Sequence, residues 1–323
     1  LMQWLNGRES RSRFIVYRAD DEWSNWTMRC ISQADRVIVL TDLNEMPDFT
    51  DFKNHLSAAG QNWSLVLLHP EATDRPRNTA AWRTASGASD IFHVRRKNDD
   101  DLARLVRILA GRAIGLVFGG GGARGFAHLG VLRAFEELGI KIDMVGGTSI
   151  GAPIAGMAAQ GKSASECLDL SIKAFSSLID MTIPFTSMIS GKRISRTIAD
   201  HTADWDIEDY WLPYFCVSTN LTTAKQVVHR CGNSALAIRS SVSIPGVLPP
   251  VPANGDLLVD GGVLNNVPIN IMREINPSGS VIAFDVAPPM GPTAKQDYGT
   301  SVSGWYQLAS RFVPWLKPVR APR

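Results

Sequence analysis

The chain has 323 residues, of which 45% are hydrophobic and 20% are charged, so it is long enough for about two folded domains of roughly 150 residues each. This balance is close to that of average globular proteins, and it excludes a wholly disordered, collagen-like or coiled-coil chain. Thirty-three Lys and Arg residues against 31 Asp and Glu residues give a formal charge of +2, so the net charge does not favour a nucleic acid as the main partner.

The cysteines and the start of the chain bear on the cellular compartment. The cysteines form no C-x-x-C pair and no zinc-type spacing with a histidine, so we expect buried free thiols rather than disulfides. The uncharged stretch 144–161 contains five glycines, and we therefore do not interpret it as a membrane span. No signal-peptide pattern follows Leu1, and we expect a cytoplasmic protein. The cysteines are Cys30, Cys167, Cys216 and Cys231.

The first part of the chain alternates apolar runs with helical patterns. The runs 14–17, 36–40 and 65–68 are typical of strands, and the patterns 23–32 and 52–59 between them are typical of helices. This order predicts a small open α/β unit with a parallel sheet. The unit contains no glycine-rich phosphate loop, no nucleophile motif and no metal cluster.

The end of this unit is predicted from two further segments. The Pro-, Thr-, Asn- and Ser-rich stretch 70–87 indicates a loop, and the pattern 99–112 indicates a helix with an acidic start. We therefore divide the chain into an accessory unit 1–111, a second unit 112–286 and a Pro- and Gly-rich extension 287–323. The histidines of the first unit are interpreted as isolated structural or surface residues; they are His55, His69 and His93.

The second unit opens with a strand, a glycine loop and a helix, in that order. An apolar run at 114–118 is followed by Gly119–Gly125 and by a helical pattern over 126–138. A second strand, Met144–Val145, leads through Gly146–Gly151 into another helical pattern. Further β-rich runs are 214–218, 226–229, 257–259 and 281–286.

The second glycine turn fits a nucleophile elbow, G-x-S-x-G, in which a serine occupies a strained turn between strand and helix. Gly147 and Gly151 flank Ser149 at the required spacing. The absence of side chains at both flanks lets the backbone segments approach closely, and the following helix helps to stabilise negative charge at its N-terminus. An ordinary strand-to-helix turn is the alternative.

The first glycine loop has two interpretations. Gly120–Gly125 satisfies G-x-G-x-x-G, the fingerprint of dinucleotide-binding folds. That fold places an acidic residue at the end of its second strand, whereas here Asp143 precedes the strand and Ser149 follows it. Consecutive main-chain N–H groups at a helix N-terminus also make an oxyanion hole, so we favour a hydrolase.

A serine nucleophile needs a base, and histidine is the usual one. His201 and His229 follow the serine, but neither has the loop signals of a strand end, and His128 fits a packing or partly exposed position in the first helix. Asp260 is the alternative, because it follows an apolar run and precedes two glycines. Partial burial there raises the pKa of a carboxyl group and makes it a better proton acceptor, although Asp-Gly-Gly alone is also a common turn.

Three blocks together resemble the signature of the patatin-like phospholipases, in that order and at these separations. They are 119–125, 147–151 and 260–262. The resemblance covers about residues 113–286, and it implies a three-layer α/β/α hydrolase domain after the smaller unit. It also implies a catalytic dyad of Ser149 and Asp260 without a histidine.

The same resemblance implies a mechanism. The main-chain N–H groups of Gly120, Gly121 and Gly122 stabilise the oxyanion, and water later cleaves an acyl-enzyme. Neither a metal nor another cofactor is implied. Three further stretches are similar to the neuropathy target esterase branch of the family, which typically carries cyclic-nucleotide-binding-like domains before this region. They are 26–30, 33–36 and 298–315.

Two roles stay open for Arg124, which joins the glycine loop to its helix: it meets a lipid phosphate or it braces the loop. Three apolar segments are candidates for an acyl channel, with core or rigid loop as their alternative interpretation: 183–185, 188–189 and 244–250. Aromatic and basic residues of the extension, at 305–323, are typical of an interfacial segment or of one that packs onto the domain.

The function expected from these features is hydrolysis of an acyl ester of a phospholipid or lysophospholipid by a serine esterase. We expect the lipid as substrate, peripheral contact with a membrane, and no nucleic-acid partner. The alternatives are a general carboxylesterase or triacylglycerol lipase, and a catalytically silent lipid-binding module.

Overall fold

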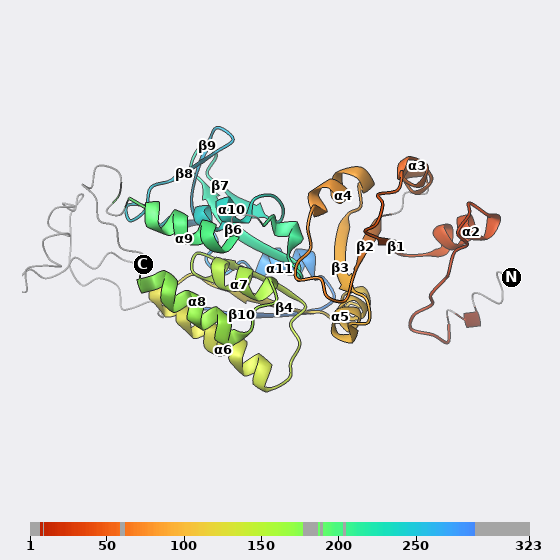
Figure 1. Cartoon of the computed structure of the whole chain (residues 1–323), viewed down its shortest axis with the longest axis horizontal. Coiled ribbons are helices and arrows are strands. Elements are labelled where there is room, and N and C mark those ends of the chain that lie inside the picture. The colour runs from red at the N-terminus through yellow and green to blue at the C-terminus, as the bar shows by residue number, and fades with distance from the viewer. Residues whose placement is uncertain are drawn as a thin grey trace, which may run out of the picture. The chain divides into compact units, whose positions relative to one another are not determined.

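The computed structural model describes residues 7–8, 10–58, 62–176, 187, 190–202 and 205–287. Residues up to Val286 belong to one compact unit, and its described part contains two separate sheets (Figure 1). Apart from Ala287, the predicted extension 287–323 lies outside the described residues.

The first sheet is small and parallel. Its strands are β1 (Val37–Asp42), β2 (Trp63–His69) and β3 (Asp90–Arg95), in that spatial order. The helices of this part are α2 (Asn25–Gln33), α3 (Thr50–Ala58), α4 (Thr79–Ser86) and α5 (Asp99–Leu109). The central strand β2 is apolar and buried along almost its whole length, as expected for a parallel strand covered on both faces. The smaller open α/β unit predicted from the sequence is thereby confirmed.

Two local predictions in this unit are wrong. The apolar run 14–17 forms no strand, and its Phe14 and Val16 side chains are 56% and 91% exposed, because no described strand pairs with it. The third strand is instead β3, whose sequence mixes charged and apolar residues. The stretch 70–87 is not all loop, since it contains α4, which is capped by Gly87 in the left-handed region with φ 66°.

The histidines of this unit are not isolated, contrary to the prediction. His69 Nε2 lies 2.9 Å from His93 Nδ1, and both side chains are buried. Burial lowers the pKa of His69 to about 4 and that of His93 to about 3. His55 stacks on Trp23, with ring centroids 4.1 Å apart. Two of the three histidines therefore form a buried neutral pair.

The second sheet is mixed and, among the described residues, contains seven strands. Its spatial order is β10-β4-β5-β6-β9-β8, with β7 paired to β6. The strands are β4 (Ile114–Phe118), β5 (Met144–Thr148), β6 (Tyr214–Asn220), β7 (Lys225–His229), β8 (Val251–Ala253), β9 (Asp256–Asp260) and β10 (Ser280–Phe284). From β10 to β6 the strands are parallel, whereas β7 and β9 run antiparallel to β6.

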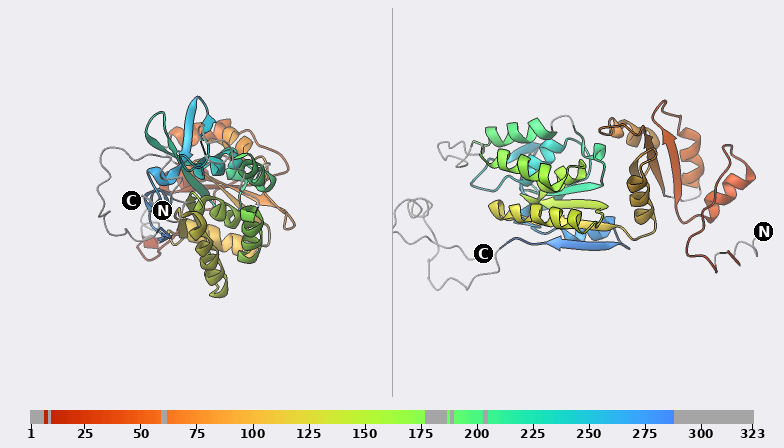
Figure 2. Two further views of the ribbon diagram at one scale, coloured as in Figure 1. Left: turned by 90° about the vertical axis from the view of Figure 1, so that its left-hand side faces the viewer. Right: turned by 60° about the horizontal axis from the view of Figure 1, so that its bottom comes forward.

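Helices cover both faces of this sheet. The elements are α6 (Phe126–Glu137), α7 (Gly151–Ala159), α8 (Ala164–Ser176), α9 (Lys192–Thr202), α10 (Ser234–Ser241) and α11 (Ile269–Ile275), with short turns η1 (Gly122–Gly125), η2 (Ile207–Asp209) and η3 (Gly261–Val263). Leu116 and Phe118 of β4 pack against α6 and α7, whereas Val117 packs against α11. Figure 2 shows α6, α7 and α8 together beside the sheet. This alternation produces the predicted three-layer α/β/α arrangement.

The two sheets are connected by α5, which lies between β3 and β4 in the chain. Its Arg107 donates three hydrogen bonds of 2.7–3.1 Å to Asp143, a fully buried residue. Asp143 also accepts a hydrogen bond from the N–H of Ile114 at the start of β4. This carboxylate therefore orders the entry into the second sheet rather than binding a ribose. The predicted boundary near residue 111 falls between α5 and β4 and stays a prediction.

Candidate active site

Ser149 lies on the turn between β5 and α7, as the motif predicts. Its φ is +55°, in the left-handed region that non-glycine residues rarely adopt, and such strain concentrates at functional turns. A Cβ at Gly147 would lie 2.5 Å from backbone atoms of Gly151, and a Cβ at Gly151 would clash with the carbonyl oxygen of Phe118. Both glycines are therefore required for the close approach of the strand and the helix.

The Asp260 carboxylate lies beside this serine. β9 ends at Asp260 and pairs antiparallel with β6, which in turn lies next to β5. The Ser149 hydroxyl donates to Asp260 Oδ2 at 2.6 Å, and the N–H of Gly262 donates to Oδ1 at 2.7 Å. A Cβ at Gly261 would clash with the carbonyl oxygen of Val217, so this turn also needs a glycine.

Burial dominates the electrostatics of the Asp260 carboxylate. Ser149 and Asp260 are buried, with only 7% and 5% of their surfaces exposed. Burial raises the pKa of Asp260, and the hydrogen bonds from Ser149 and Gly262 offset part of that increase. A carboxylate with a raised pKa is a stronger proton acceptor than an exposed one.

The histidines considered from the sequence lie elsewhere. His128 is fully buried and its Nε2 bonds the carbonyl oxygen of Gly119 at 2.8 Å. His229 Nε2 bonds the Ser218 hydroxyl at 2.7 Å, and His201 is exposed on α9. Within the described ranges, no histidine hydrogen-bonds the Ser149 or Asp260 side chain.

The glycine loop lies against the serine. A Cβ at Gly120 would be 3.0 Å from the Ser149 Cβ and 2.5 Å from the side-chain oxygen of Asn266. The Gly120 N–H donates to the main-chain oxygen of Asn266 at 3.1 Å, which does not fit the oxyanion role predicted for it. The N–H groups of Gly121 and Gly122 have no acceptor among the described residues.

Asn266 and His128 were not predicted as site residues, yet both fix the peptide planes of this loop. Asn266 Nδ2 donates to the carbonyl oxygen of Gly120 at 3.1 Å, and His128 holds that of Gly119. In a trans peptide the C=O and the next N–H point in opposite directions, so Asn266 turns the Gly121 N–H away from itself. The signal in the sequence is the Asn pair that follows Asp-Gly-Gly, four residues beyond the block that was considered.

Ser241, another residue that sequence reasoning missed, supports the elbow. Its hydroxyl accepts from the Ser149 N–H at 3.0 Å and donates to the carbonyl oxygen of Val217 at 2.7 Å. It is fully buried at the end of α10. Nothing near it in the sequence marks this contact, which joins residues 92 positions apart.

Arg124 is exposed, and its side chain makes no hydrogen bond or ion pair with a described residue. The contacts therefore give no support to the loop-bracing interpretation. Of the proposed channel segments, 183–185 and 188–189 lie outside the described residues, as does the aromatic and basic part of the extension. In 244–250, Leu248 is buried and Ile244 is 40% exposed.

The described part of the chain offers neither a metal cluster nor a membrane-spanning helix. Within the described ranges there is no group of three or more His, Cys, Asp or Glu side chains that could hold a metal ion. In the same part of the chain, every helix is too short or too polar to cross a bilayer.

Comparisons with known proteins show the family of this chain. Residues 116–273 match the family model of the patatin-like phospholipases, and residues 1–99 match the model described as the P-loop like domain of the Neuropathy Target Esterase family. The chain belongs to the patatin-like phospholipase family, in its neuropathy target esterase-like branch. The resemblance seen in the three glycine blocks is thereby confirmed, together with the fold that it implied.

Several curated relatives match over the whole chain. Neuropathy target esterase sws from Drosophila melanogaster and patatin-like phospholipase domain-containing protein 6 from Homo sapiens are each 36% identical over 100% of this chain. The chain spans about a quarter of their length, 25% and 26%. Among solved structures, VipD from Legionella pneumophila covers 53% of this chain and 49% of its own, with 16% identity and a TM-score of 0.42, which is too distant to inform the site.

Proposed function

We propose that this chain is a serine esterase that hydrolyses acyl esters of phospholipids or lysophospholipids. The observation that carries the proposal is the 2.6 Å hydrogen bond from the Ser149 hydroxyl to Asp260, beside a loop whose Gly121 and Gly122 N–H groups meet no acceptor in the described part of the chain. Family membership supports a lipid ester as the substrate, since the matching model is that of patatin-like phospholipases.

In this proposal Asp260 is the general base. Its Oδ2 accepts the hydroxyl proton as Ser149 Oγ attacks the ester carbonyl carbon. The hydrogen bond from Gly262 to the other oxygen, Oδ1, fixes the orientation of the carboxylate. The proton then passes to the leaving alcohol, which departs as the acyl-enzyme forms, and water activated by Asp260 later releases the fatty acid.

The oxyanion is stabilised by the main-chain N–H groups of Gly121 and Gly122 in this mechanism. Both N–H groups lack an acceptor among the described residues, and an unpaired donor next to a nucleophile is suited to a developing negative charge. Gly120 contributes through its missing side chain, because a Cβ there would come within 3.0 Å of the Ser149 Cβ. Asn266 is a positioning residue for this loop.

Apolar side chains around Asp260 suit a lipid substrate. Val263 and Leu264 directly follow the Asp-Gly-Gly turn and are 52% and 53% exposed. Ile244 follows Ser243, whose carbonyl oxygen accepts the Asp260 N–H at 2.9 Å, and it is 40% exposed. Exposed apolar groups beside a reactive site are typical of surfaces that contact lipid. We extend the proposal to peripheral contact with a membrane at this edge.

The proposal is tested by incubating the chain with a lipid mixture and identifying the products by mass. Ser149→Ala is expected to abolish fatty-acid release, whereas Ser32→Ala, at an exposed serine of α2, is expected to leave it unchanged. Lysophosphatidylcholine, triolein and short-chain nitrophenyl esters in parallel separate a phospholipase from a triacylglycerol lipase and from a general esterase. Turnover retained by Ser149→Ala, at the level of the Ser32 control, would overturn the assignment.

Membrane contact has its own test. Sedimentation with phosphatidylcholine vesicles is compared between the chain, a Val263→Asp/Leu264→Asp variant and a chain that ends at residue 299. Loss of binding in the double variant is the expected result. Loss of binding only in the shortened chain assigns the contact to the extension. Unchanged binding of both variants contradicts the proposed membrane contact at either place.

A further inference from the structure

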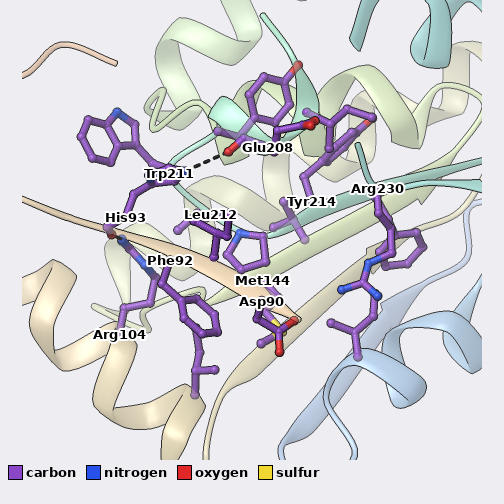
Figure 3. A pocket seen from close by; sticks show the side chains of 18 of the residues that line it. Asp90, Phe92, His93, Arg104, Met144, Glu208, Trp211, Leu212, Tyr214 and Arg230 are labelled. Atoms are coloured by element: carbon purple, nitrogen blue, oxygen red, sulfur yellow. Dashed lines mark hydrogen bonds between the residues drawn. The ribbon is translucent and has the colours of Figure 1, made fainter. Parts of the chain in front are cut away.

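A cavity of about 220 Å³ lies apart from Ser149, between the first sheet and the second (Figure 3). Its walls come from β3 and α5 on one side, and from the starts of β5 and β6, from η2 and from α11 on the other. Met144 begins β5, whereas Ser149 follows its other end. The cavity is therefore at the edge of the sheet opposite to the proposed active site.

The walls are held together by specific bonds. His93 Nε2 lies 2.8 Å from the Glu208 carbonyl oxygen, which connects β3 to η2. The N–H of Thr79 donates to Asp209 Oδ1 at 2.9 Å. The indole of Trp211 donates to the Asp74 carbonyl oxygen at 3.1 Å and lies under the guanidinium of Arg95. The shape of the cavity is thus defined by bonds on both of its sides.

Four arginines and three acidic residues line the cavity, and most of the acidic groups are already engaged. Asp101 bonds Arg104 at 2.9 Å and also bonds Arg95. Glu208 Oε2 accepts the N–H of Gly232 at 2.6 Å. The arginines are Arg36, Arg83, Arg104 and Arg230, and the third acidic residue is Asp90.

Two of the guanidinium groups have no ion-pair partner among the described residues. Arg83 Nε is buried without a hydrogen-bond acceptor, which is costly for a charged group. Arg230 is exposed at the rim, on the far side of the view from His93 (Figure 3). Arg36 has only a loose contact of 4.0 Å with Asp90. Because Glu208 keeps its negative charge while it accepts the neutral N–H of Gly232, the four arginines and three acidic residues of the lining leave one net positive charge facing the cavity.

The remaining lining is apolar and aromatic. Phe92, Met144 and Leu212 lie in the middle of the close-up, with Tyr214 beside them (Figure 3). A cavity of roughly 150 Å³ is enough to hold a benzene ring, and ordinary ligand sites occupy about 300–1,000 Å³. The space here suits a single ring or a short chain with one charged group attached.

We propose that this cavity binds a small organic anion, with an apolar body on its floor and its negative group against Arg83 and Arg230. The chemistry shared by the candidate ligands is one carboxylate or phosphate on a body of about ring size. The space encloses a ring-sized body rather than a full acyl chain, so we infer an occupant different from the lipid substrate proposed for Ser149. The inference is independent of the proposed esterase function, because none of the lining residues belongs to the Ser149 site.

The test is calorimetric titration of the full chain carrying Ser149→Ala, which keeps the proposed active site from turning over any probe. Phenyl phosphate and benzoate represent the two anionic groups, and benzyl alcohol represents an uncharged body of the same size. We expect saturable binding of at least one anion, at least tenfold weaker binding of benzyl alcohol, and weakening with added salt. The tighter of the two anions identifies the preferred group.

Arginine variants complete the test. Arg230→Gln, at an exposed position, and Arg83→Gln are each expected to weaken anion binding at least tenfold, whereas Arg133→Gln, on the exposed face of α6, leaves it unchanged. Thermal unfolding of each variant establishes whether it is folded. If Arg83→Gln is not folded, the binding measured with Arg230→Gln alone decides whether the arginines hold the anion. Absence of saturable binding, equal binding of benzyl alcohol, or equal binding by Arg230→Gln would overturn the proposal.

Discussion

Replacing Asn266 by Ala tests whether the glycine loop is an oxyanion hole with a defined orientation. The change removes the 3.1 Å hydrogen bond from Asn266 Nδ2 to the carbonyl oxygen of Gly120 but keeps the main-chain bond from the Gly120 N–H. A hydrogen bond of this kind contributes about 0.5–1.5 kcal/mol net. If that energy selects the peptide orientation, its loss lowers the rate by a factor of up to about 10. Complete loss of an oxyanion donor would lower the rate by about 100- to 1,000-fold.

We therefore expect kcat to fall by about 3- to 10-fold, with KM nearly unchanged, because the donor acts on charge that develops only in the transition state. The assay is initial-rate hydrolysis of a soluble lysophospholipid below its critical micelle concentration. Asn265→Ala is a matched control, since among the described residues the Asn265 side-chain amide donates only to Gln226 and Asn270, at the surface. Its kcat is expected to stay within about twofold of the original.

A purely structural role for Asn266 would give a different pattern. In that case the variant loses thermal stability while the kcat of the folded fraction is preserved. A kcat of Asn266→Ala within twofold of the Asn265→Ala control refutes the idea that this amide orients the oxyanion donor.

Three further predictions concern the elbow, its base and the buried ion pair. Because burial raises the pKa of Asp260 and catalysis needs the carboxylate, kcat/KM is expected to fall as the pH is lowered through a pKa above the ordinary 3.8; a limb at or below that value in a pH–rate profile contradicts this. Gly151→Ala is expected to be destabilised by about 1–3 kcal/mol through overpacking and to lose activity, as measured by thermal unfolding and hydrolysis. Arg107→Met leaves Asp143 buried and unpaired and is expected to cost about 3–5 kcal/mol, whereas Arg133→Met removes an exposed pair worth about 0–1 kcal/mol; equal denaturation midpoints for the two variants would refute the difference.

Local patterns in the sequence were sufficient for the elements that carry the proposed chemistry. The glycines around Ser149 and after Asp260 are required by close backbone contacts, so the steric requirement is visible in the residue type itself. The apolar runs 114–118 and 257–259 lie in strands β4 and β9, and they are buried apart from Ile114, which is partly buried, and Leu257, which is 45% exposed. Both proposed reactive side chains lie where a strand of this sheet ends.

Contacts between distant segments could not be predicted in this way. Whether the apolar run 14–17 becomes a strand depends on a neighbour to pair with, and the described chain offers none. His69 and His93 are 24 residues apart and meet only because β2 and β3 are adjacent. Asn266 and Gly120 are 146 residues apart, so no spacing rule connects them. The hydrogen bond from the Gly120 N–H to the main-chain oxygen of Asn266 joins the same two distant residues.

The central proposal is that Asp260, without a histidine, activates Ser149. Its most direct test is labelling with a fluorophosphonate, followed by peptide mass spectrometry of the original chain, Ser149→Ala and Asp260→Asn. We expect a single adduct on Ser149 in the original chain, none in Ser149→Ala, and labelling slowed by at least 100-fold in folded Asp260→Asn. An adduct on another residue, or undiminished labelling of Asp260→Asn, would contradict the proposed dyad.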